Sequence, residues 1–369
     1  MYNINRLKKI IMLRLSILVV VFCFPSVLIG KNAFESPKLS NPDSWTMIML
    51  PDPQAYITFD RNQPLFDLMI TWIASHVDSL NINMVVCTGD LVNHNYYLNP
   101  DGINANQTSV QQWEAVSKSF ERLDGIVPYA LATGNHDYTS LPNRNRQTFF
   151  DDYFPSHRNR LNLRVLRDVG TDAEGYPTLA NASYEIITPQ KNKYLILVLE
   201  YAPCDITLAW AEKIIKQQKY IDHKVILLTH SYMYDINRKN ERIVSESSKL
   251  ETPNWGEDIW QKLVKPSKNI SLVLCGHTAA PDDWNGAVGF RKDRNSLGKI
   301  VPQMMFNTQA LGGGWRGNGG DGWLRILEFL PDGKTVKVKT FSPLFAISPS
   351  TRHLAWNRES YNEFIFELE

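Results

Sequence analysis

The chain has 369 residues, 43% of them hydrophobic and 21% charged, and its formal net charge is +1. These values are typical of a globular protein with a sizeable apolar core. The balanced charge gives no basic surface field that would favour binding to a nucleic-acid polymer. The chain also lacks an acidic tail that would suggest a chaperone-like role.

The first 30 residues have the pattern of a secretory signal peptide. A basic start, from Arg6 to Arg14, precedes an apolar run over residues 15–23, and Pro25 follows. The run is shorter than the roughly 20 apolar residues that a membrane-spanning helix needs. We therefore expect residues 1–30 to be cleaved and the mature protein to be exported, periplasmic or extracellular, with no membrane contact. An uncleaved N-terminal membrane anchor is the alternative.

Three cysteines remain after the signal, at positions 87, 204 and 275. An odd number in an exported protein leaves at least one free thiol. Cys87 and Cys275 each end a strongly apolar run, so we expect both to be buried and unpaired.

Six short apolar runs predict strands that are buried on both faces. In chain order they cover residues 45–50, 82–87, 127–132, 194–201, 224–228 and 270–274. Between them, apolar residues recur every three to four positions over 64–80, 109–125 and 205–222, which predicts helices. Strands alternating with helices indicate an α/β fold.

Two regions interrupt this alternation. Residues 138–181 lack a clear period, and we expect an insertion lying over the functional site. The glycine-rich segment 310–323 predicts a loop, but not a P-loop, because the Lys-Ser/Thr ending is missing. Alternating residues nearer the end predict antiparallel strands within 300–369. We expect residues 31–369 to form one domain.

Polar side chains follow five of the predicted strands. In an α/β sheet the carboxyl ends of the strands are where sites are built. Carboxylates, amides and imidazoles are also the ligands of borderline and hard divalent metals. The side chains at these ends are Asp52, Gln54, Asp90, Asn93, Asn135, His136, Asp137, His230 and His277.

These residues stand in five ordered motifs, DPQ, GDLVN, GNHD, TH and GHTA, within residues 45–280. In this order they resemble the calcineurin-like metallophosphoesterase superfamily, and the Asp-Pro-Gln motif resembles a sub-branch with many exported bacterial members. The resemblance implies a fold of two packed mixed β-sheets flanked by helices, a four-layer sandwich. It also implies two metal ions bridged by one carboxylate.

The resemblance assigns a role to each motif residue. Asp90 would bridge the ions, and Asn135, His230 and His277 would complete one metal site. Asp52 and Gln54 would hold the other metal. His136 would stabilise the transition state or protonate the leaving oxygen. Asp137 would orient the His136 ring, or else serve as a structural turn carboxylate.

Four further residues are candidates for substrate contact. Asn93 either touches substrate or finishes a turn, and His94 either enters the pocket or is a solvated loop residue. Asn307 and Gln309, near the glycine-rich segment, either contact substrate or replace a missing metal ligand.

The last motif has Ala279 where the family has a second histidine, and Gln54 replaces the histidine of the first motif. We therefore expect one tight and one weaker divalent metal ion, with manganese, iron or zinc as the candidates. The expected function is a secreted metal-dependent phosphoesterase acting on a phosphomonoester or phosphodiester. The alternative is a non-catalytic ligand-binding protein on a degenerate phosphoesterase scaffold. The intact GNHD motif favours the enzyme.

Overall fold

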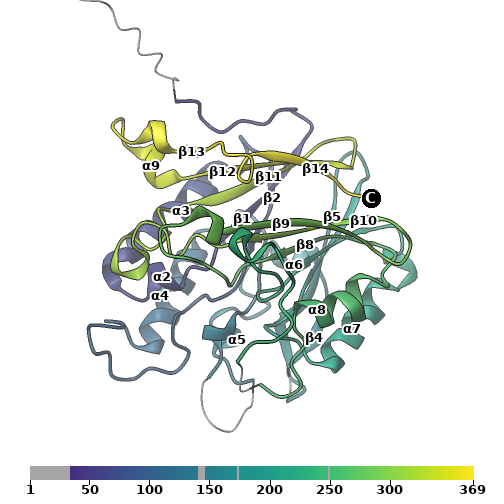
Figure 1. Cartoon of the computed structure of the whole chain (residues 1–369), viewed down its shortest axis with the longest axis horizontal. Helices are drawn as coiled ribbons and strands as arrows, with labels where there is room; N and C mark the ends of the chain where they lie inside the picture. The colour runs from purple at the N-terminus through teal and green to yellow at the C-terminus, as the bar shows by residue number, and fades with distance from the viewer. Residues whose placement is uncertain (1–33, 140–145, 173, 248–249) are drawn as a thin grey trace, which may run out of the picture. The chain divides into compact units, whose positions relative to one another are not determined.

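A computed structural model describes residues 34–139, 146–172, 174–247 and 250–369 (Figure 1). Residues Ser36–Glu369 form one compact unit. The other unit, Met1–Glu35, lies almost entirely outside the described ranges, so the signal peptide expected over residues 1–30 stays a prediction. Within the described ranges, no helix is long and apolar enough to span a membrane.

Two mixed β-sheets make up the centre of the compact unit (Figure 1). The first sheet has the order β13-β12-β11-β1-β2-β3, with β14 paired to β12, and the second has the order β4-β5-β6-β7-β8-β10-β9. The strands of the first sheet are β1 (Trp45–Leu50), β2 (Ile82–Cys87), β3 (Tyr129–Leu131), β11 (Leu324–Phe329), β12 (Thr335–Phe341), β13 (Trp356–Asn357) and β14 (Phe364–Glu367). Those of the second are β4 (Leu166–Thr171), β5 (Pro177–Ile187), β6 (Lys193–Val198), β7 (Lys224–Leu228), β8 (Ile270–Cys275), β9 (Val288–Arg294) and β10 (Ile300–Phe306).

The central strands of each sheet run parallel. In the first sheet β1, β2 and β3 are parallel neighbours, and in the second β6, β7, β8 and β10 are parallel neighbours. Antiparallel strands such as β11 and β9 complete the sheets. Because parallel strands end at the same edge of a sheet, the loops after β1, β2 and β3 lie together, as do those after β7, β8 and β10.

The two sheets pack face to face through aromatic side chains. The Trp45 ring stacks on Phe329 of the first sheet, with ring centroids 4.1 Å apart. The same ring meets the edge of Tyr194, on β6 of the second sheet, at 5.1 Å. Every residue of β1 is buried, as expected for a strand covered on both faces.

Helices cover the outer faces. The α-helices are α2 (Gln54–Ile57), α3 (Gln63–Ser75), α4 (Ser109–Glu121), α5 (Phe150–Tyr153), α6 (Asn162–Val165), α7 (Asp205–Ile215), α8 (Gly256–Ile259) and α9 (Pro343–Ile347). A π-helical turn, η5 (Trp260–Val264), continues α8, and the 3-10 turns are η1 (Asp60–Asn62), η2 (Asn135–Asp137), η3 (Gln218–Tyr220), η4 (Ile236–Arg238), η6 (Trp284–Gly286), η7 (Gly314–Arg316) and η8 (Arg352–Leu354).

Helix α7 and the α8–η5 segment bury Leu208, Ile214 and Leu263 in one cluster with Leu227 of the second sheet. On the first sheet, the Trp72 ring of α3 lies 5.0 Å from Phe341 of β12. The order helix, sheet, sheet, helix is therefore the predicted four-layer sandwich.

All six predicted strands are present, as β1, β2, β3, β6, β7 and β8, and the expected antiparallel pair near the end is β11 with β12. The three predicted helices are α3, α4 and α7, although each ends before its predicted limit. The periodic pattern predicted for α7 includes the residues of η3. In the structure α7 ends at Ile215, and η3 is a separate 3-10 turn. Cys87 and Cys275 are buried and free, as predicted.

Of residues 138–181, for which we expected an insertion lying over the site, the structure describes 138–139, 146–172 and 174–181. The described part forms α5, α6, β4 and the beginning of β5, and β4 pairs antiparallel with β5 at the edge of the second sheet. Only one of the six β4 residues is buried, because β4 is an edge strand with a single neighbour, so its sequence lacks an apolar run.

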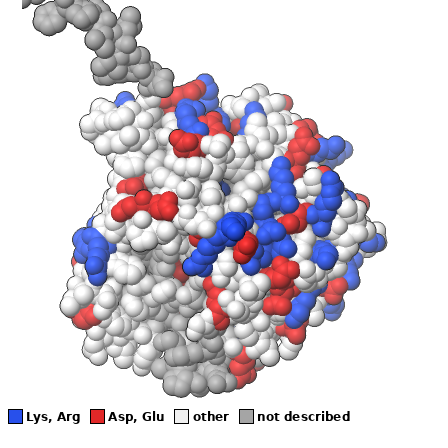
Figure 2. Space-filling model, viewed as in Figure 1, with Lys and Arg blue, Asp and Glu red and all other residues white. Residues whose placement is uncertain are grey.

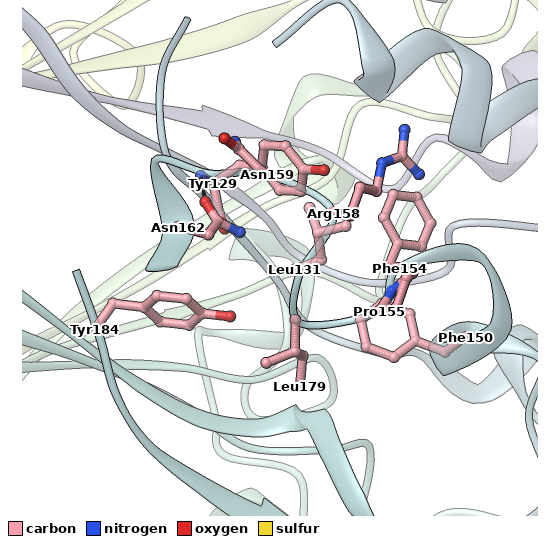
Figure 3. A pocket seen from close by; sticks show the side chains of 10 residues that line it. All are labelled: Tyr129, Leu131, Phe150, Phe154, Pro155, Arg158, Asn159, Asn162, Leu179 and Tyr184. Carbon is pink, nitrogen blue, oxygen red and sulfur yellow. Dashed lines mark hydrogen bonds between the residues drawn. The ribbon is translucent and has the colours of Figure 1, made fainter. Parts of the chain in front are cut away.

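The same segment closes the free edge of β3. The side chain of Asn162 accepts a hydrogen bond from the Tyr129 amide at 2.8 Å and donates one to the Tyr129 carbonyl at 2.9 Å. Beside this contact, α5 packs Phe150 and Phe154 around a cavity of about 10 Å³ (Figure 3). A cavity of that size holds about one water molecule, so it is a packing gap of the interior.

Basic and acidic side chains are interspersed on the face drawn in Figure 2. Ion pairs of the chain include Lys262 Nζ with Asp205 Oδ1 at 2.8 Å and Arg158 Nε with Asp124 Oδ2 at 2.9 Å. The mixture agrees with the nearly neutral net charge of the chain.

Candidate metal centre

The predicted site residues come from loops that follow five parallel strands, and both sheets contribute. Asp52 and Gln54 follow β1, Asp90 follows β2, and Asn135 and His136 follow β3, all in the first sheet. His230 follows β7 and His277 follows β8, in the second sheet. The centre therefore lies where the strand ends of the two sheets meet.

Glycines allow these loops to approach closely. A Cβ atom on Gly134 would overlap the Asp90 carboxylate, and one on Gly276 would overlap the carboxylate of Asp52. Asp90 and His277 themselves have φ angles of 48° and 79°, in the region that side chains disfavour. Strained backbone at such positions is typical of functional sites.

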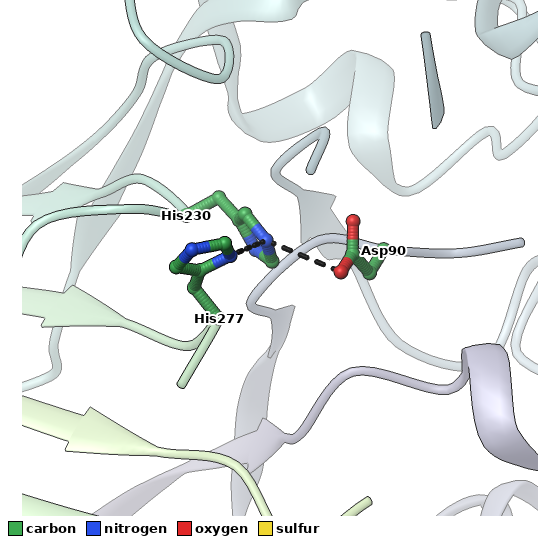
Figure 4. Close-up of side chains that lie close together, drawn as sticks. All are labelled: Asp90, His230 and His277. Atoms are coloured by element: carbon green, nitrogen blue, oxygen red, sulfur yellow. Dashed lines mark hydrogen bonds and ion pairs between the residues drawn. The ribbon is translucent and has the colours of Figure 1, made fainter. Parts of the chain in front are cut away.

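Asp90, His230 and His277 form a compact cluster (Figure 4). One ligand atom of each lies within 4.8 Å of the others. Nε2 of His230 is 3.3 Å from Asp90 Oδ2, 3.1 Å from His277 Nδ1 and 3.1 Å from Asn135 Oδ1. We call these four residues, Asp90, Asn135, His230 and His277, the complete half of the centre.

The outer contacts of the two imidazoles select the nitrogen that faces inward. Nδ1 of His230 lies 2.8 Å from the Thr88 carbonyl and donates to it, which leaves the lone pair on Nε2. Nε2 of His277 lies 2.7 Å from Glu246 Oε1, which in the same way leaves the lone pair on Nδ1. Two nitrogen lone pairs, a carboxylate oxygen and an amide oxygen thus converge, and this donor set fits a divalent metal ion.

The electrostatics of the cluster favour a positive charge. Burial alone would lower the pKa of His230, but the Asp90 and Asp52 carboxylates raise it to about 10. Burial alone would raise the pKa of Asp90, but the charges of His230 and His136 hold it well below its usual range. A cation at this position is therefore stabilised by the same carboxylates.

The other half of the centre comprises Asp52, Gln54 and position 279, and we call it the depleted half. The fully buried Asp52 accepts hydrogen bonds from Thr88 Oγ1 at 2.7 Å, the His277 amide at 3.0 Å and Asn307 Nδ2 at 2.6 Å. Burial raises the pKa of Asp52 to about 6. Ala279, where the family has a histidine, lines the adjoining cavity and offers no donor atom.

Gln54 carries one of ten buried side-chain polar atoms that lack a hydrogen-bond partner in the described part of the chain. Its Oε1 atom has no hydrogen-bond partner among the described residues, although the side chain is only 6% exposed. A buried acceptor left unpaired costs about 1–3 kcal/mol, so such atoms usually mark a ligand or an ordered water. The oxygen fits a metal ligand in the depleted half.

Asn307, a candidate for substrate contact or for replacing a missing ligand, contacts Asp52 and is not among the residues that line the cavity. It is fully buried, and its Nδ2 donates to Asp52 Oδ2 and, at 3.1 Å, to the His277 carbonyl. Its Oδ1 accepts from the Gln309 amide at 3.2 Å. Asn307 therefore holds the Asp52 carboxylate in place, while Gln309 lines the cavity.

His136 lines the cavity and is partly exposed. Its backbone amide donates to Asp90 Oδ1 at 2.9 Å, and its Nδ1 donates to the Asn93 carbonyl at 2.8 Å. The second contact fixes the ring, so the orienting group is a backbone carbonyl rather than Asp137.

The Asp137 side chain contacts backbone amides, whereas the His136 ring contacts the Asn93 carbonyl. Its buried carboxylate accepts hydrogen bonds from the amides of Val92 at 3.0 Å and Gly134 at 2.8 Å. Burial, followed by the Asp90 charge, raises the pKa of Asp137 to about 8. Asp137 therefore joins the loops after β2 and β3, which is the structural alternative.

Asn93 and His94 differ in their position. Asn93 lines the cavity, whereas His94 is not among its lining residues. The His94 ring stacks on Tyr97, with centroids 4.6 Å apart, and burial lowers its pKa. The structure therefore places Asn93, but not His94, beside the metal centre.

The cavity next to the centre measures about 560 Å³. Its lining residues are Gln54, Asn93, His136, His277, Ala279, Pro281, Asp282, Gln309, Ala310, Gly313, Gly314, Trp315 and Arg316. Ligand pockets commonly measure about 300–1,000 Å³, so this one has room for more than a phosphoryl group.

Glu246 is a site residue that the sequence did not reveal. Besides its contact with His277, its Oε2 accepts a hydrogen bond from Ser231 Oγ at 2.7 Å. Burial would raise the pKa of Glu246, but the hydrogen bond and charge of His277 lower it. The residue lies in a polar segment that follows no strand, so neither periodicity nor a motif pointed to it.

The family model for calcineurin-like phosphoesterases matches residues 52–281. The chain belongs to the calcineurin-like phosphoesterase family. This calcineurin-like phosphoesterase is 28% identical over 310 residues to the uncharacterized protein YvnB of Bacillus subtilis (strain 168). The alignment covers 82% of this chain but only 20% of YvnB, so the chain spans about a fifth of that relative's length.

Solved structures similar to this family member include a dimetal phosphatase from Danio rerio, with a TM-score of 0.45 and 9% identity over 88% of this chain and 99% of the other. GAP50 of Plasmodium, the anchor in the inner membrane complex, has a TM-score of 0.45 and 11% identity, covering 88% and 89% of the two chains. A putative 5'-nucleotidase from Staphylococcus aureus has a TM-score of 0.40 and 9% identity, covering 88% and 53%.

Proposed function

We propose that the protein is a secreted, metal-dependent phosphoesterase that hydrolyses a phosphomonoester or a phosphodiester. The observation that carries the proposal is the convergence of the complete half, in which the donor atoms of Asp90, Asn135 and His277 all lie within 3.3 Å of His230 Nε2. Membership of the phosphoesterase family supports the reaction class. Export rests on the sequence pattern of residues 1–30 alone.

Divalent ions bound at the two halves would neutralise charge on the phosphoryl oxygens and activate the attacking water. We assign a tight ion to the complete half, because two imidazoles, an amide and a carboxylate suit manganese, iron or zinc. A weaker ion is assigned to the depleted half, where Asp52, Gln54 and the bridging Asp90 supply only oxygen atoms.

His136 would act on the leaving group. Its Nδ1 is committed to the Asn93 carbonyl, and its ring lines the cavity, which leaves Nε2 for the substrate. An imidazole at this place can stabilise phosphoryl charge or donate a proton to the departing oxygen. The backbone carbonyl of Asn93 holds the His136 ring, and Asn93 also lines the cavity.

The test begins with chelation of the purified protein, followed by reloading with manganese, iron or zinc. We expect hydrolysis of at least one ester in a panel of monoesters and diesters to disappear with the ion and to return when it is restored. The matched variant is His136→Ala, which should bind the ion normally. Hydrolysis that survives complete removal of the ion would refute the proposal.

The rival function is a ligand-binding protein without catalysis, and the observation that favours it is the loss of two histidines from the depleted half. A non-catalytic protein saturated with metal ion would bind phosphate esters without hydrolysing them. Calorimetry showing such binding, together with no turnover of any panel member under any of the three metals, would decide for the rival.

A further inference from the structure

The cavity is lined by more than the candidate metal ligands, because a glycine-rich loop supplies part of its wall. Gly313, Gly314, Trp315 and Arg316 of this loop line the same cavity as Gln54, Asn93, His136 and His277. A phosphoryl group at the ligands would leave most of the roughly 560 Å³ for the rest of the ester. The loop therefore lies where the remainder of the substrate would rest.

The backbone of this loop is held in a defined conformation by its glycines and by hydrogen bonds. Gly312, Gly313 and Gly314 have φ angles of 60°, 77° and 56°, which residues with side chains rarely adopt. The Gly313 amide donates to Asp282 Oδ1 at 3.0 Å. The carbonyl of Trp315 accepts from Arg61 Nη2 at 3.0 Å and from Asn62 Nδ2 at 3.3 Å.

Trp315 is unusual among the tryptophans. All ten lie in the described ranges, and Trp315, at 43% exposure, is the one that is exposed rather than buried or half-buried. An aromatic side chain left exposed on a fixed backbone at the rim of a cavity supplies a flat apolar surface at little entropic cost.

We propose that Trp315 and Arg316 form a subsite for a planar aromatic ring on the leaving group of the ester. This inference rests on the proposed function. Trp315 would stack on the ring, because the faces of aromatic rings pack favourably in offset arrangements. Arg316 is exposed, and no ion pair engages it within the described part of the chain, so its guanidinium is available to acceptor atoms on the ring edge.

Two sources of such a ring are distinguishable, a nucleobase and a simple aryl group. A nucleobase carries nitrogen and oxygen acceptors that Arg316 would bind, whereas a phenyl ring carries none. The experiment measures kcat/KM for a nucleoside monophosphate, phenyl phosphate and glycerol phosphate with the wild type, Trp315→Ala, Trp315→Phe and Arg316→Ala.

Trp315→Ala should lower kcat/KM about tenfold for both ring-bearing esters and less than twofold for glycerol phosphate, as expected for loss of one stacking surface. Trp315→Phe should restore most of the loss. A further loss in Arg316→Ala confined to the nucleotide would identify a nucleobase, and no loss would identify an aryl ring. Equal losses for all three esters, or none for the ring-bearing ones, would overturn the subsite.

Calorimetry with the nucleoside monophosphate and phenyl phosphate separates this proposal from the function on which it rests. If the wild type hydrolyses no ester but Trp315→Ala weakens binding of a ring-bearing ester about tenfold, the subsite stands and the phosphoesterase assignment falls. If the wild type turns over esters with no preference for a ring, the assignment stands and the subsite falls.

A second inference comes from Glu246, whose contacts are independent of the cavity wall. Its carboxylate lies 2.7 Å from His277 Nε2 and accepts at 2.7 Å from Ser231, the neighbour of His230. The Glu246 and His277 side chains are only 16% and 19% exposed. One carboxylate thus joins the two strand ends of the second sheet that carry the imidazoles.

We infer that Glu246 is a positioning residue that presents Nδ1 of His277 to the metal ion. Carboxylates that hold the outer nitrogen of a ligand histidine fix its tautomer and orientation, and their loss typically costs 10–100-fold in metal affinity. Glu246→Ala should therefore weaken manganese or zinc binding by about that factor, measured by calorimetry. Glu246→Gln, which keeps an acceptor, should weaken it less.

Glu114→Ala, an exposed position on α4, is the matched control and should leave ion affinity unchanged. The ring nitrogen signals of His277 by NMR provide a readout without any ion: the wild type should show the hydrogen on Nε2, and Glu246→Ala should show a mixture of tautomers. Ion affinity within twofold of the wild type, with an unchanged tautomer, would overturn the role. A wild type that binds no divalent ion would instead refute the proposed function.

Discussion

The complete half and the depleted half of the candidate metal centre are neighbours, since His230 Nδ1 lies 4.0 Å from Asp52 Oδ1, but their side chains are held differently. In the complete half, two imidazoles have their outer nitrogens held by Thr88 and Glu246, and their inner nitrogens are 3.1 Å apart. In the depleted half, Asp52 already accepts three hydrogen bonds, and Gln54 Oε1 has no partner among the described residues. The first half is therefore preorganised for an ion, and the second would have to give up existing contacts to bind one.

This difference shows that the frame of a site and its number of ligands are separate properties. The Asp52 carboxylate, Gly276 and the strand ends surround the depleted half as glycines and strand ends surround the complete half. The two halves differ in the number of donor atoms, and with it in the expected affinity of one ion relative to the other.

The largest effect is expected from His230→Ala. The change removes the atom on which the complete half converges and leaves Asp90 and Asn135 without their nearest partner. Loss of a direct ligand should exceed the 10–100-fold affinity loss typical of outer contacts. Metal analysis should find the tight ion absent, and ester hydrolysis should disappear with it. Retention of one ion per chain would mean that the complete half was assigned wrongly.

His136→Ala is expected to act on turnover alone. Without its imidazole, kcat should fall by roughly 10²–10⁴, the range of a general acid–base group. The metal content should match that of the wild type, because the ring contacts the Asn93 carbonyl and not the converging donor atoms. Loss of bound ion together with activity would show that His136 is a ligand.

The double change Gln54→His with Ala279→His tests the depleted half directly. It returns two imidazoles to positions that line the cavity, so the weaker ion should bind about tenfold or more tightly. Titration with manganese, followed by activity, should show saturation at lower concentration than in the wild type. Two tight ions in the unmodified protein, surviving prolonged chelation, would contradict the contrast between the halves.

The smallest effect on catalysis is expected from Asp137→Asn. The amide preserves the shape but places an NH₂ group against the amides of Val92 or Gly134, so the free energy of unfolding should fall by about 1–3 kcal/mol. Activity at a temperature where the variant is folded should stay within a few-fold of the wild type. A loss of 10²-fold or more without loss of stability would restore the catalytic role that the structure does not support.

Sequence patterns predicted the central strands and the polar residues that gather at their ends, because both follow from the burial of these strands. Parallel strands buried on both faces are apolar throughout, so a polar residue directly after such a strand, as with Asp90 or His230, is conspicuous. Glu246 and the packing role of Asn307 were missed, since both depend on contacts between irregular segments distant in the chain. The edge strand β4 was missed because, with a neighbour on one side only, it needs no apolar run.

The complete half draws Asp90 and Asn135 from one sheet and His230 and His277 from the other. An ion bound there would link the two sheets, so dissociation of the ion would be thermodynamically coupled to separation of the sheets during unfolding. At a free concentration a thousandfold above its dissociation constant, such an ion would add about 4 kcal/mol to the unfolding free energy. Where divalent metals are scarce, the supply of metal would then govern how long the molecule lasts as well as how fast it works.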